Sequence, residues 1–226
     1  MTGEWIDVAV SGGTMAAYRV GTGAAGLVML QEIFGVNAAM QEKARRFAAH
    51  GYTVLVPDVF WRLEPRVALG YSGADREKAF AFFGRFDLAA GVQDIAAAAR
   101  HLERSHPKLG VIGFCLGGRL AVASTAAYPF RCVASLYGVK LEADPERLRA
   151  IDVPLQVHVG DRDSHVPQES IQAIRAALQG RANAEVFVYE GAQHGFFNAA
   201  RPEVHAPQAA RQAEERILAL FRRALT

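Results

Sequence analysis

The sequence of 226 residues contains only two cysteines, carries almost no net charge and has no long apolar run. Two cysteines cannot form the disulfide framework of a small secreted domain. The formal net charge of +2 arises from basic residues scattered among acidic ones, and without a basic stripe we expect no nucleic-acid partner. No run approaches the roughly 18 apolar residues that a membrane span needs, so we expect no membrane association.

The first residues also lack a basic segment followed by an apolar one, so we expect no secretory signal there. Together with the scarcity of cysteine, this predicts a reduced, cytoplasmic setting. Cys132 lies in an apolar run and is interpreted as a core residue. The histidines, cysteines and carboxylates show no spacing typical of metal ligands, and no glycine-rich turn opens a helix after a strand as a phosphate-binding loop does. We therefore expect no metal and no cofactor.

Hydrophobic residues make up 51% of the chain, enough for a large core. Strands are predicted at 6–10, 15–20, 26–30, 54–56, 109–112, 132–136, 155–159 and 185–189, and helices at about 37–50, 87–105, 119–127, 168–178 and 207–225. This alternation predicts one α/β domain over residues 1–226, with a mostly parallel sheet and helices on both faces. Residues 60–86, rich in aromatics and arginines, are predicted to form a loop and a short helix over the site.

Residues 113–117, G-F-C-L-G, have the G-x-S-x-G form of a nucleophile elbow with cysteine in place of serine. A strand-like run precedes them and a helix-like run follows, which is the context that the motif requires. Glycine at both ends avoids crowding in the tight turn. The turn is expected to present the Cys115 sulfur at a helix N-terminus, where the helix dipole favours a thiolate. The alternative is a structural cysteine, because free cysteine is often buried.

An aspartate and a histidine follow Cys115 in the chain order that is typical of a catalytic triad. Asp163 lies in the segment 160–167, GDRDSHVP, after one strand-like run, and His194 follows the next such run. The order nucleophile, acid, histidine is that of an α/β-hydrolase. Loops at the carboxyl ends of parallel strands are where such folds place their chemistry. We therefore expect an α/β-hydrolase fold in which Cys115, Asp163 and His194 are catalytic.

The segment 31–37, QEIFGVN, directly follows the strand predicted at 26–30. In an α/β-hydrolase this loop supplies one backbone N–H of the oxyanion hole, and the residue after the nucleophile supplies the other. In this chain these residues are Ile33 and Leu116. Glu32 is unusual beside such N–H groups, and its alternative role is that of an exposed loop acid.

Four segments together resemble the dienelactone hydrolase family over nearly the whole chain: 31–37, 113–118, 160–167 and 191–194. The resemblance implies that Cys115 is the nucleophile and His194 the base. It also implies that Asp163, rather than Asp161, is the acid. Finally, it implies that Glu32 contacts the resting thiol and takes part in activating it.

The substrate-binding residues depart from the family pattern. A family arginine that binds the substrate carboxylate corresponds to Arg76, but a family tyrosine is replaced by Phe80 and a second arginine by Asn198. Losing one of two arginines weakens an anion clamp, so we expect poor activity on dienelactone unless Arg201 reaches the same space. Tyr137, at a strand end, either lines the pocket or packs in the core. It is counted with Arg76, Phe80 and Asn198 as a candidate substrate-binding residue.

The sequence thus predicts a monomeric, cofactor-independent hydrolase that cleaves a small ester or lactone through an acyl-cysteine intermediate. A thiolate is a good leaving group when it attacks an amide, which favours activated esters and lactones over peptides. Two alternatives stay open: a non-catalytic ligand-binding protein on the same fold, and a hydrolase of a thioester or a neutral aryl ester. Of the remaining histidines, His158 is predicted to lie in the core and His165 at the pocket rim.

Overall fold

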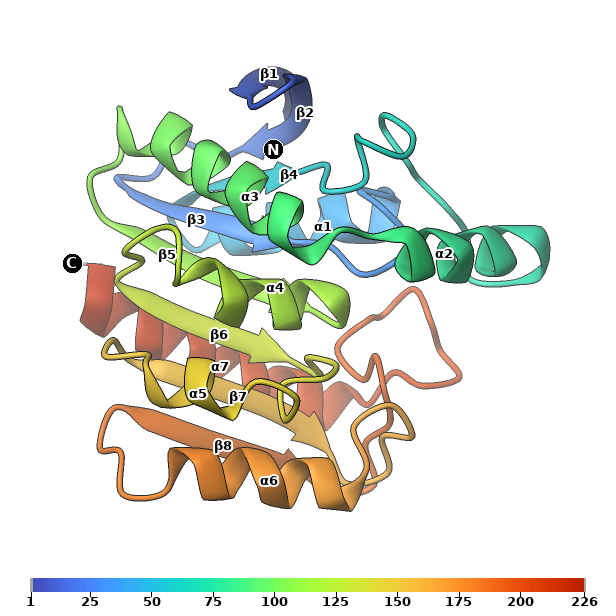
Figure 1. Cartoon of the computed structure of the whole chain (residues 1–226), viewed down its shortest axis with the longest axis vertical. Helices are drawn as coiled ribbons and strands as arrows, with labels where there is room; N and C mark the ends of the chain where they lie inside the picture. The colour runs from blue at the N-terminus through green and yellow to red at the C-terminus, as the bar shows by residue number, and fades with distance from the viewer. Residues whose placement is uncertain (1, 226) are drawn as a thin grey trace.

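The computed structural model describes residues 2–225, which form an eight-stranded sheet between two layers of helices (Figure 1). The strands are β1 (Glu4–Val10), β2 (Gly13–Val20), β3 (Ala25–Leu30), β4 (Tyr52–Pro57), β5 (Leu109–Phe114), β6 (Cys132–Leu136), β7 (Leu155–Gly160) and β8 (Ala184–Tyr189). The helices are α1 (Ala38–Ala49), α2 (Gly73–Arg85), α3 (Leu88–Glu103), α4 (Leu116–Ser124), α5 (Pro145–Arg149), α6 (Gln168–Leu178) and α7 (Pro207–Leu225).

The sheet has the strand order β1-β2-β4-β3-β5-β6-β7-β8. β2 pairs antiparallel with β1 and β4, and the other neighbours pair in parallel. The predicted mostly parallel sheet is therefore confirmed, and β1 and β2 form an antiparallel hairpin at one edge of it. The parallel strands end at the right of Figure 1, where α2 and the loop after β8 also lie. Segments that follow different strands are thereby brought to one edge.

Two buried clusters cover the two faces of the sheet. One contains the apolar faces of α3, α4 and α6, and the other contains those of α1 and α7. The face of α7 that packs on the sheet includes Ile217 and Phe221, which are both buried. On this face the Phe221 ring lies 6.1 Å from that of Phe47 in α1. The sheet is thus fixed from both sides, which gives the loops at its edge a rigid base.

Two predicted helix starts are confirmed by their capping hydrogen bonds. Asn37 Oδ1 accepts from the Met40 N–H at 3.1 Å, and Asp87 Oδ1 accepts from the Ala90 N–H at 3.0 Å. Each side chain satisfies a backbone donor that has no partner within the helix. The cap of α1 also fixes where the loop after β3 must end, and this loop borders the site described below.

Three helices differ from the sequence-based expectation. α4 begins at Leu116 rather than at Arg119, because the Cys115 carbonyl already accepts hydrogen bonds from the first turn, and it ends at Ser124. The helix within residues 60–86 has 13 residues and is longer than expected. α5 was not predicted, although Asp144 followed by proline is a helix-start signal, and Asp144 does cap it.

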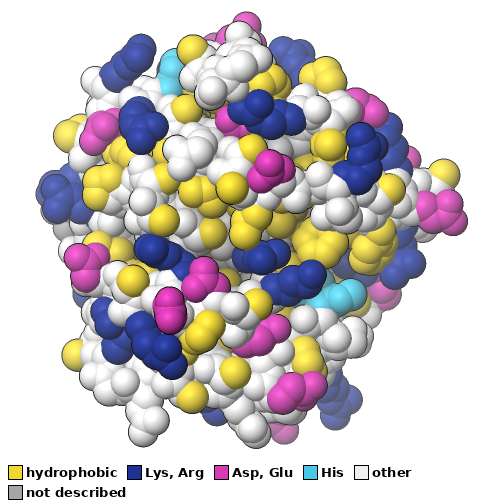
Figure 2. All heavy atoms as spheres, viewed as in Figure 1, with side chains coloured by type: hydrophobic (Ala, Val, Ile, Leu, Met, Phe, Trp, Pro, Cys, Tyr) yellow, Lys and Arg dark blue, Asp and Glu magenta, His cyan; other side chains and the backbone are white. Residues whose placement is uncertain are grey.

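Within residues 2–225, no helix is both long and apolar enough to cross a membrane. The same residues contain no group of three or more histidines, cysteines and carboxylates that could hold a metal ion. Figure 2 shows basic and acidic side chains interspersed over the visible face.

Candidate active site

Cys115 lies in a strained turn between β5 and α4. Its backbone angles are φ 55° and ψ −116°, in a region that side-chain-bearing residues rarely adopt. A Cβ added at Gly113 would collide with the Gly117 carbonyl, and one added at Gly117 would collide with the Leu30 carbonyl. The predicted steric need for both glycines is therefore confirmed. Cys115 is a free, partly exposed thiol, whereas Cys132 is buried, and burial raises the pKa of the Cys132 thiol to about 12.

Asp163 and His194 meet through a direct contact between the loops after β7 and β8. His194 Nδ1 lies 2.8 Å from Asp163 Oδ2 and 3.1 Å from Oδ1. Because an ionised carboxylate only accepts hydrogen bonds, this contact places the imidazole proton on Nδ1. The backbone N–H groups of His165 and Val166 also donate to Asp163 Oδ1, at 2.8 and 3.1 Å. Asp163 is thus held firmly and in turn orients His194.

The second ring nitrogen of His194, Nε2, is buried and has no hydrogen-bond partner within residues 2–225. Burial by itself lowers the pKa of His194. The nearby Cys115 side chain and the Asp163 carboxylate outweigh this effect and raise the pKa of His194 above its ordinary value. The imidazolium form is therefore favoured when the neighbouring thiol is ionised.

The two expected oxyanion-hole donors lie on segments that are in contact. The Gly117 N–H donates to the Gln31 carbonyl at 3.0 Å, which fixes the start of α4 against the loop after β3. Within residues 2–225, neither the Ile33 N–H nor the Leu116 N–H donates a hydrogen bond to another group. Ile33 lines the pocket that contains Cys115. Two unused backbone donors beside a nucleophile are what an oxyanion requires.

Glu32 is buried, which contradicts the alternative of an exposed loop acid. Its Oε1 accepts from the Tyr137 hydroxyl at 2.9 Å, and its Oε2 accepts from Asn198 Nδ2 at 3.1 Å. The Asn198 amide also donates to the Tyr71 hydroxyl at 3.0 Å. Burial, and then the adjacent Glu32, raise the pKa of Tyr137 well above its ordinary value, so the hydroxyl remains a donor.

This arrangement corrects the expectation that Tyr137 and Asn198 contact substrate. Their exposed fractions are 0% and 1%, and neither lines the pocket. Both side chains turn inward because the buried Glu32 carboxylate needs hydrogen-bond donors. The Tyr137 ring also packs against the His194 ring, edge to face with ring centroids 5.0 Å apart.

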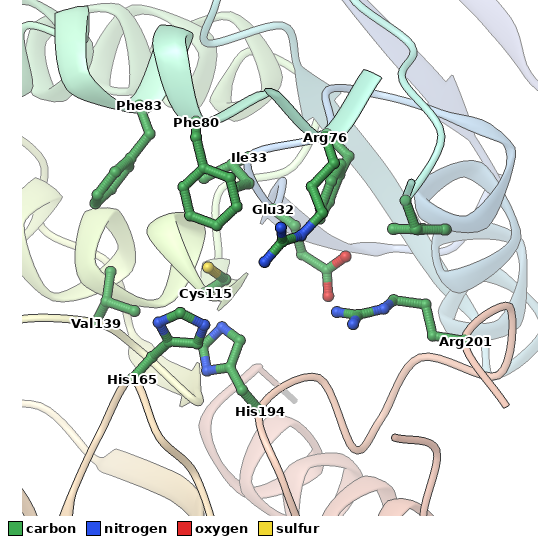
Figure 3. A pocket seen from close by; sticks show the side chains of 12 residues that line it. Glu32, Ile33, Arg76, Phe80, Phe83, Cys115, Val139, His165, His194 and Arg201 are labelled. Atoms are coloured by element: carbon green, nitrogen blue, oxygen red, sulfur yellow. The ribbon is translucent and has the colours of Figure 1, made fainter. Parts of the chain in front are cut away.

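The pocket above Cys115 combines apolar walls with two guanidinium groups. In Figure 3, Arg76, Phe80 and Phe83 project from α2 on one side, His165 and His194 lie opposite, and Cys115 lies between them. Arg201, from the loop after β8, lines the same pocket. Arg201 therefore reaches the substrate space, the possibility that the sequence had left open.

The side chains of the two arginines are held in different ways. The Arg76 guanidinium lies 5.0 Å from the centroid of the Phe80 ring, and Phe80 is 40% exposed. Arg201 Nε donates to Glu203 Oε1 at 2.9 Å, and its guanidinium lies 5.5 Å from the Tyr71 ring centroid. Stacking on an aromatic face leaves guanidinium N–H groups available for an anionic ligand.

Two residues that line the pocket, Tyr71 and Phe83, were not identified from the sequence. Both belong to the segment predicted to cover the site, but no motif identified them individually. His165 lines the pocket, in agreement with its predicted position at the rim, and its ring centroid lies 4.6 Å from that of His194. His158 is a core residue, as predicted, because it is fully buried and its Nδ1 lies 2.8 Å from the Tyr189 hydroxyl.

The strand-turn-helix elbow and the parallel sheet together define an α/β-hydrolase. A model described as "Dienelactone hydrolase family" matches residues 14–225. The carboxymethylenebutenolidase of Pseudomonas putida is 36% identical over 196 residues, which cover 84% of this chain and 83% of that protein. Carboxymethylenebutenolidase 1 of Cupriavidus pinatubonensis is 33% identical over 199 residues, which cover 85% of each.

The fold comparison agrees with these sequence matches. The crystal structure of a putative dienelactone hydrolase from Klebsiella pneumoniae superposes with a TM-score of 0.83 at 24% identity, covering 97% of this chain and 98% of that chain. The chain belongs to the dienelactone hydrolase family. The protein is accordingly a dienelactone hydrolase-like enzyme of the carboxylic ester hydrolase class.

Proposed function

We propose that the protein cleaves an ester or lactone through an acyl-cysteine intermediate, with Cys115, His194 and Asp163 as catalytic residues. The observation that supports this most strongly is the geometry around His194. One ring nitrogen is bound to Asp163, the other has no partner within residues 2–225, and the charge of Cys115 raises the pKa of the ring. A base oriented by an acid and coupled to a nucleophile is the arrangement that nucleophilic catalysis requires.

In the acylation step, His194 Nε2 takes the proton of the Cys115 thiol, and the resulting thiolate attacks the carbonyl carbon of the substrate. The carbonyl oxygen becomes an oxyanion and accepts hydrogen bonds from the Ile33 and Leu116 N–H groups. When the intermediate collapses, the carbon–oxygen bond to the leaving group breaks and His194 Nε2 gives its proton to that oxygen. In a lactone the leaving oxygen stays attached to the acyl group, so the ring opens and nothing is released.

In the deacylation step, His194 is neutral again and takes a proton from a water molecule, which attacks the thioester carbonyl. The Cys115 thiolate leaves, and the acid product dissociates. Asp163 stabilises the imidazolium that forms in each half-reaction. We further propose that Glu32 tunes the ionisation of the thiol from its buried position beside the pocket.

Trapping the acyl group would test this mechanism directly. In a His194→Ala variant, an aryl ester with a good leaving group should still acylate the thiol, but water activation is lost, so the thioester should accumulate. Mass spectrometry should then find one acyl group per chain, on the peptide that contains Cys115. The peptide containing Cys132 is the internal control. At an alkaline pH, where the thiol ionises without a base, an adduct on any other residue, or none, would contradict the proposal.

We propose that the substrate carries a carboxylate, because Arg76 and Arg201 line the pocket together. The sequence alone suggested that only one of two arginines is retained, and hence poor activity on dienelactone. With Arg201 in the pocket, a carboxylated lactone becomes the preferred class of substrate. The exposed Phe80 and the adjacent Phe83 suit the apolar part of such a molecule.

Removing either arginine should reduce selectivity for carboxylated substrates. A charge-assisted hydrogen bond contributes roughly 1.5–3 kcal/mol. Arg76→Ala or Arg201→Ala should therefore lower kcat/KM for a carboxylated lactone by about 10- to 100-fold. The measurement is the ratio of kcat/KM for a carboxylated lactone to that for a neutral aryl ester. Arg19→Ala is the control, because Arg19 pairs with Glu4 in the β1–β2 hairpin. If this ratio is unchanged in both arginine variants, the substrate should be sought among neutral esters.

The apolar wall of the pocket is also compatible with a second class of substrate. Phe80 and Phe83 would also accept a neutral aryl ester or thioester, and the substrate comparison above separates these possibilities. A purely ligand-binding role is less well supported than catalysis, because ligand binding does not need a strained cysteine beside a hydrogen-bonded histidine–aspartate pair. A single catalytic domain, a monomeric state and a cytoplasmic location remain predictions.

A further inference from the structure

The Tyr71 hydroxyl has an unusual set of hydrogen bonds for a group in a side chain that lines the pocket. It accepts from Asn37 Nδ2 at 3.2 Å and from Asn198 Nδ2 at 3.0 Å. The orientation of each amide is fixed by a backbone donor. Asn37 Oδ1 accepts from the Met40 N–H. Asn198 Oδ1 accepts from the Ala200 N–H at 3.1 Å. Both contacts to the tyrosine oxygen therefore come from NH₂ groups, which can only donate.

These two contacts leave the hydroxyl proton of Tyr71 without an acceptor. A hydroxyl has two acceptor lone pairs and one proton to donate, and the two amides use both lone pairs. Within residues 2–225 the hydroxyl donates to no other group. The nearby Glu32 carboxylate receives its hydrogen bonds from Tyr137 and Asn198 instead. The half-buried Tyr71 thus carries an unused donor at the pocket.

The Tyr71 ring is held in place by the loop after β3. The Val36 N–H donates to the Val67 carbonyl, and the Leu69 N–H donates to the Phe34 carbonyl, both at 2.9 Å. The Phe34 ring also meets the Tyr71 ring edge to face, with centroids 4.7 Å apart. A donor that is fixed in this way loses little conformational entropy when a ligand binds.

A positive charge lies beside the same ring. The Arg201 guanidinium lies 5.5 Å from the centroid of the Tyr71 ring, and in Figure 3 Arg76 and Arg201 reach into the pocket from different elements. The pocket thus has two guanidinium groups against one carboxyl side chain, that of Glu32. An acceptor at the Tyr71 hydroxyl is close to a guanidinium, so an anionic acceptor gains from both groups.

The Tyr71 hydroxyl keeps its proton over the working range of an esterase. Burial, and then the adjacent Glu32, raise the pKa of Tyr71 above its ordinary value, which outweighs the opposite effects of Asn198, Asn37 and Arg201. The group is therefore available as a neutral hydrogen-bond donor.

We propose that Tyr71 is a specificity-determining residue whose hydroxyl donates a hydrogen bond to the carboxylate of the substrate, beside Arg201. The proposal rests on the proposed function in one respect, namely that the substrate carries a carboxylate. The two arginines attract an anion over a range of positions, because Coulomb attraction depends only weakly on direction. A hydrogen bond from a fixed O–H weakens steeply with angle. Tyr71 thus sets where the carboxylate oxygen lies in the pocket.

The test compares two aryl esters that differ in charge. para-Nitrophenyl hydrogen adipate carries a free carboxylate, its methyl ester does not, and release of nitrophenolate reports cleavage of the same bond in both. Tyr71→Phe removes the hydroxyl and keeps the ring between Phe34 and Arg201. The ratio of kcat/KM for the acid to that for the methyl ester should fall by about 10-fold, the size of a hydrogen bond to a charged group.

Tyr18→Phe is the matched control. The Tyr18 hydroxyl also accepts a hydrogen bond, from Arg45 Nη1 at 3.1 Å, but Tyr18 does not line the pocket. Its ratio should equal that of the wild-type protein. The methyl ester reports on the surroundings of Tyr71, because the substitution also removes an acceptor for Asn37 and Asn198. A purely structural role would lower kcat/KM for both esters and leave their ratio unchanged.

Arg201→Ala, measured with the same two esters, separates this proposal from the proposed function. If Arg201→Ala lowers the ratio and folded Tyr71→Phe does not, the role of Tyr71 is overturned and the preference for a carboxylated substrate stands. If the wild-type protein shows no preference for the acid, the substrate class is wrong, and the role of Tyr71 fails with it. A lowered ratio in both variants, with the methyl ester cleaved normally by Tyr71→Phe, supports the proposal.

Discussion

Cys115→Ala is expected to lower kcat for ester hydrolysis by on the order of 10⁴-fold or more. Without the sulfur no acyl-enzyme can form, and only the binding and oxyanion contributions remain. The measurement is the steady-state hydrolysis of an activated aryl ester by purified protein. Alanine is smaller than cysteine and Cys115 is partly exposed, so the fold should be unaffected.

The second cysteine provides the matched control for this experiment. Cys132 is fully buried in β6, away from the pocket. Cys132→Ala should lower the melting temperature, because it leaves a small void in the core, but it should keep most of the activity. Near-normal turnover by Cys115→Ala would show that another residue is the nucleophile.

Asp163→Asn should lower kcat by about 10³- to 10⁴-fold. The amide can present its NH₂ group to His194, which favours the tautomer with the proton on Nε2, and it no longer stabilises the imidazolium. Binding of substrate should change little, so the loss should appear in kcat rather than in KM. Steady-state kinetics over a range of ester concentrations would separate the two parameters.

Asp161→Asn is the matched control, because Asp161 lies two residues away on the same loop. Its Oδ1 accepts from the Gly191 N–H at 2.7 Å, and the asparagine oxygen can keep this hydrogen bond. Activity should therefore remain close to that of the wild-type protein. Equal losses in the two variants would mean that loop structure, rather than the carboxylate beside His194, controls the rate.

The sequence by itself determined the architecture. Hydrophobic runs of strand length, alternating with helical periodicity and separated by caps such as Asn37, specify a mostly parallel sheet because these signals are local. The elbow was equally readable, since the strained backbone of Cys115 requires glycine at nearby positions whose identity is visible in the chain. The order of Asp163 and His194 after Cys115 completed the prediction of the catalytic residues, because each follows a strand that ends at the same edge of the sheet.

The tertiary structure decided which side chains face the pocket. Tyr137 and Asn198 turn inward to the buried Glu32, whereas Arg201 reaches the pocket. The burial of Lys43 is invisible in sequence, because α1 carries this side chain against Phe114 only after the helix packs on the sheet. Loop conformation and the partner of a buried charge depend on contacts between segments far apart in the chain. Local patterns therefore fix the elements and the elbow, but only packing sets the direction and electrostatic surroundings of each side chain.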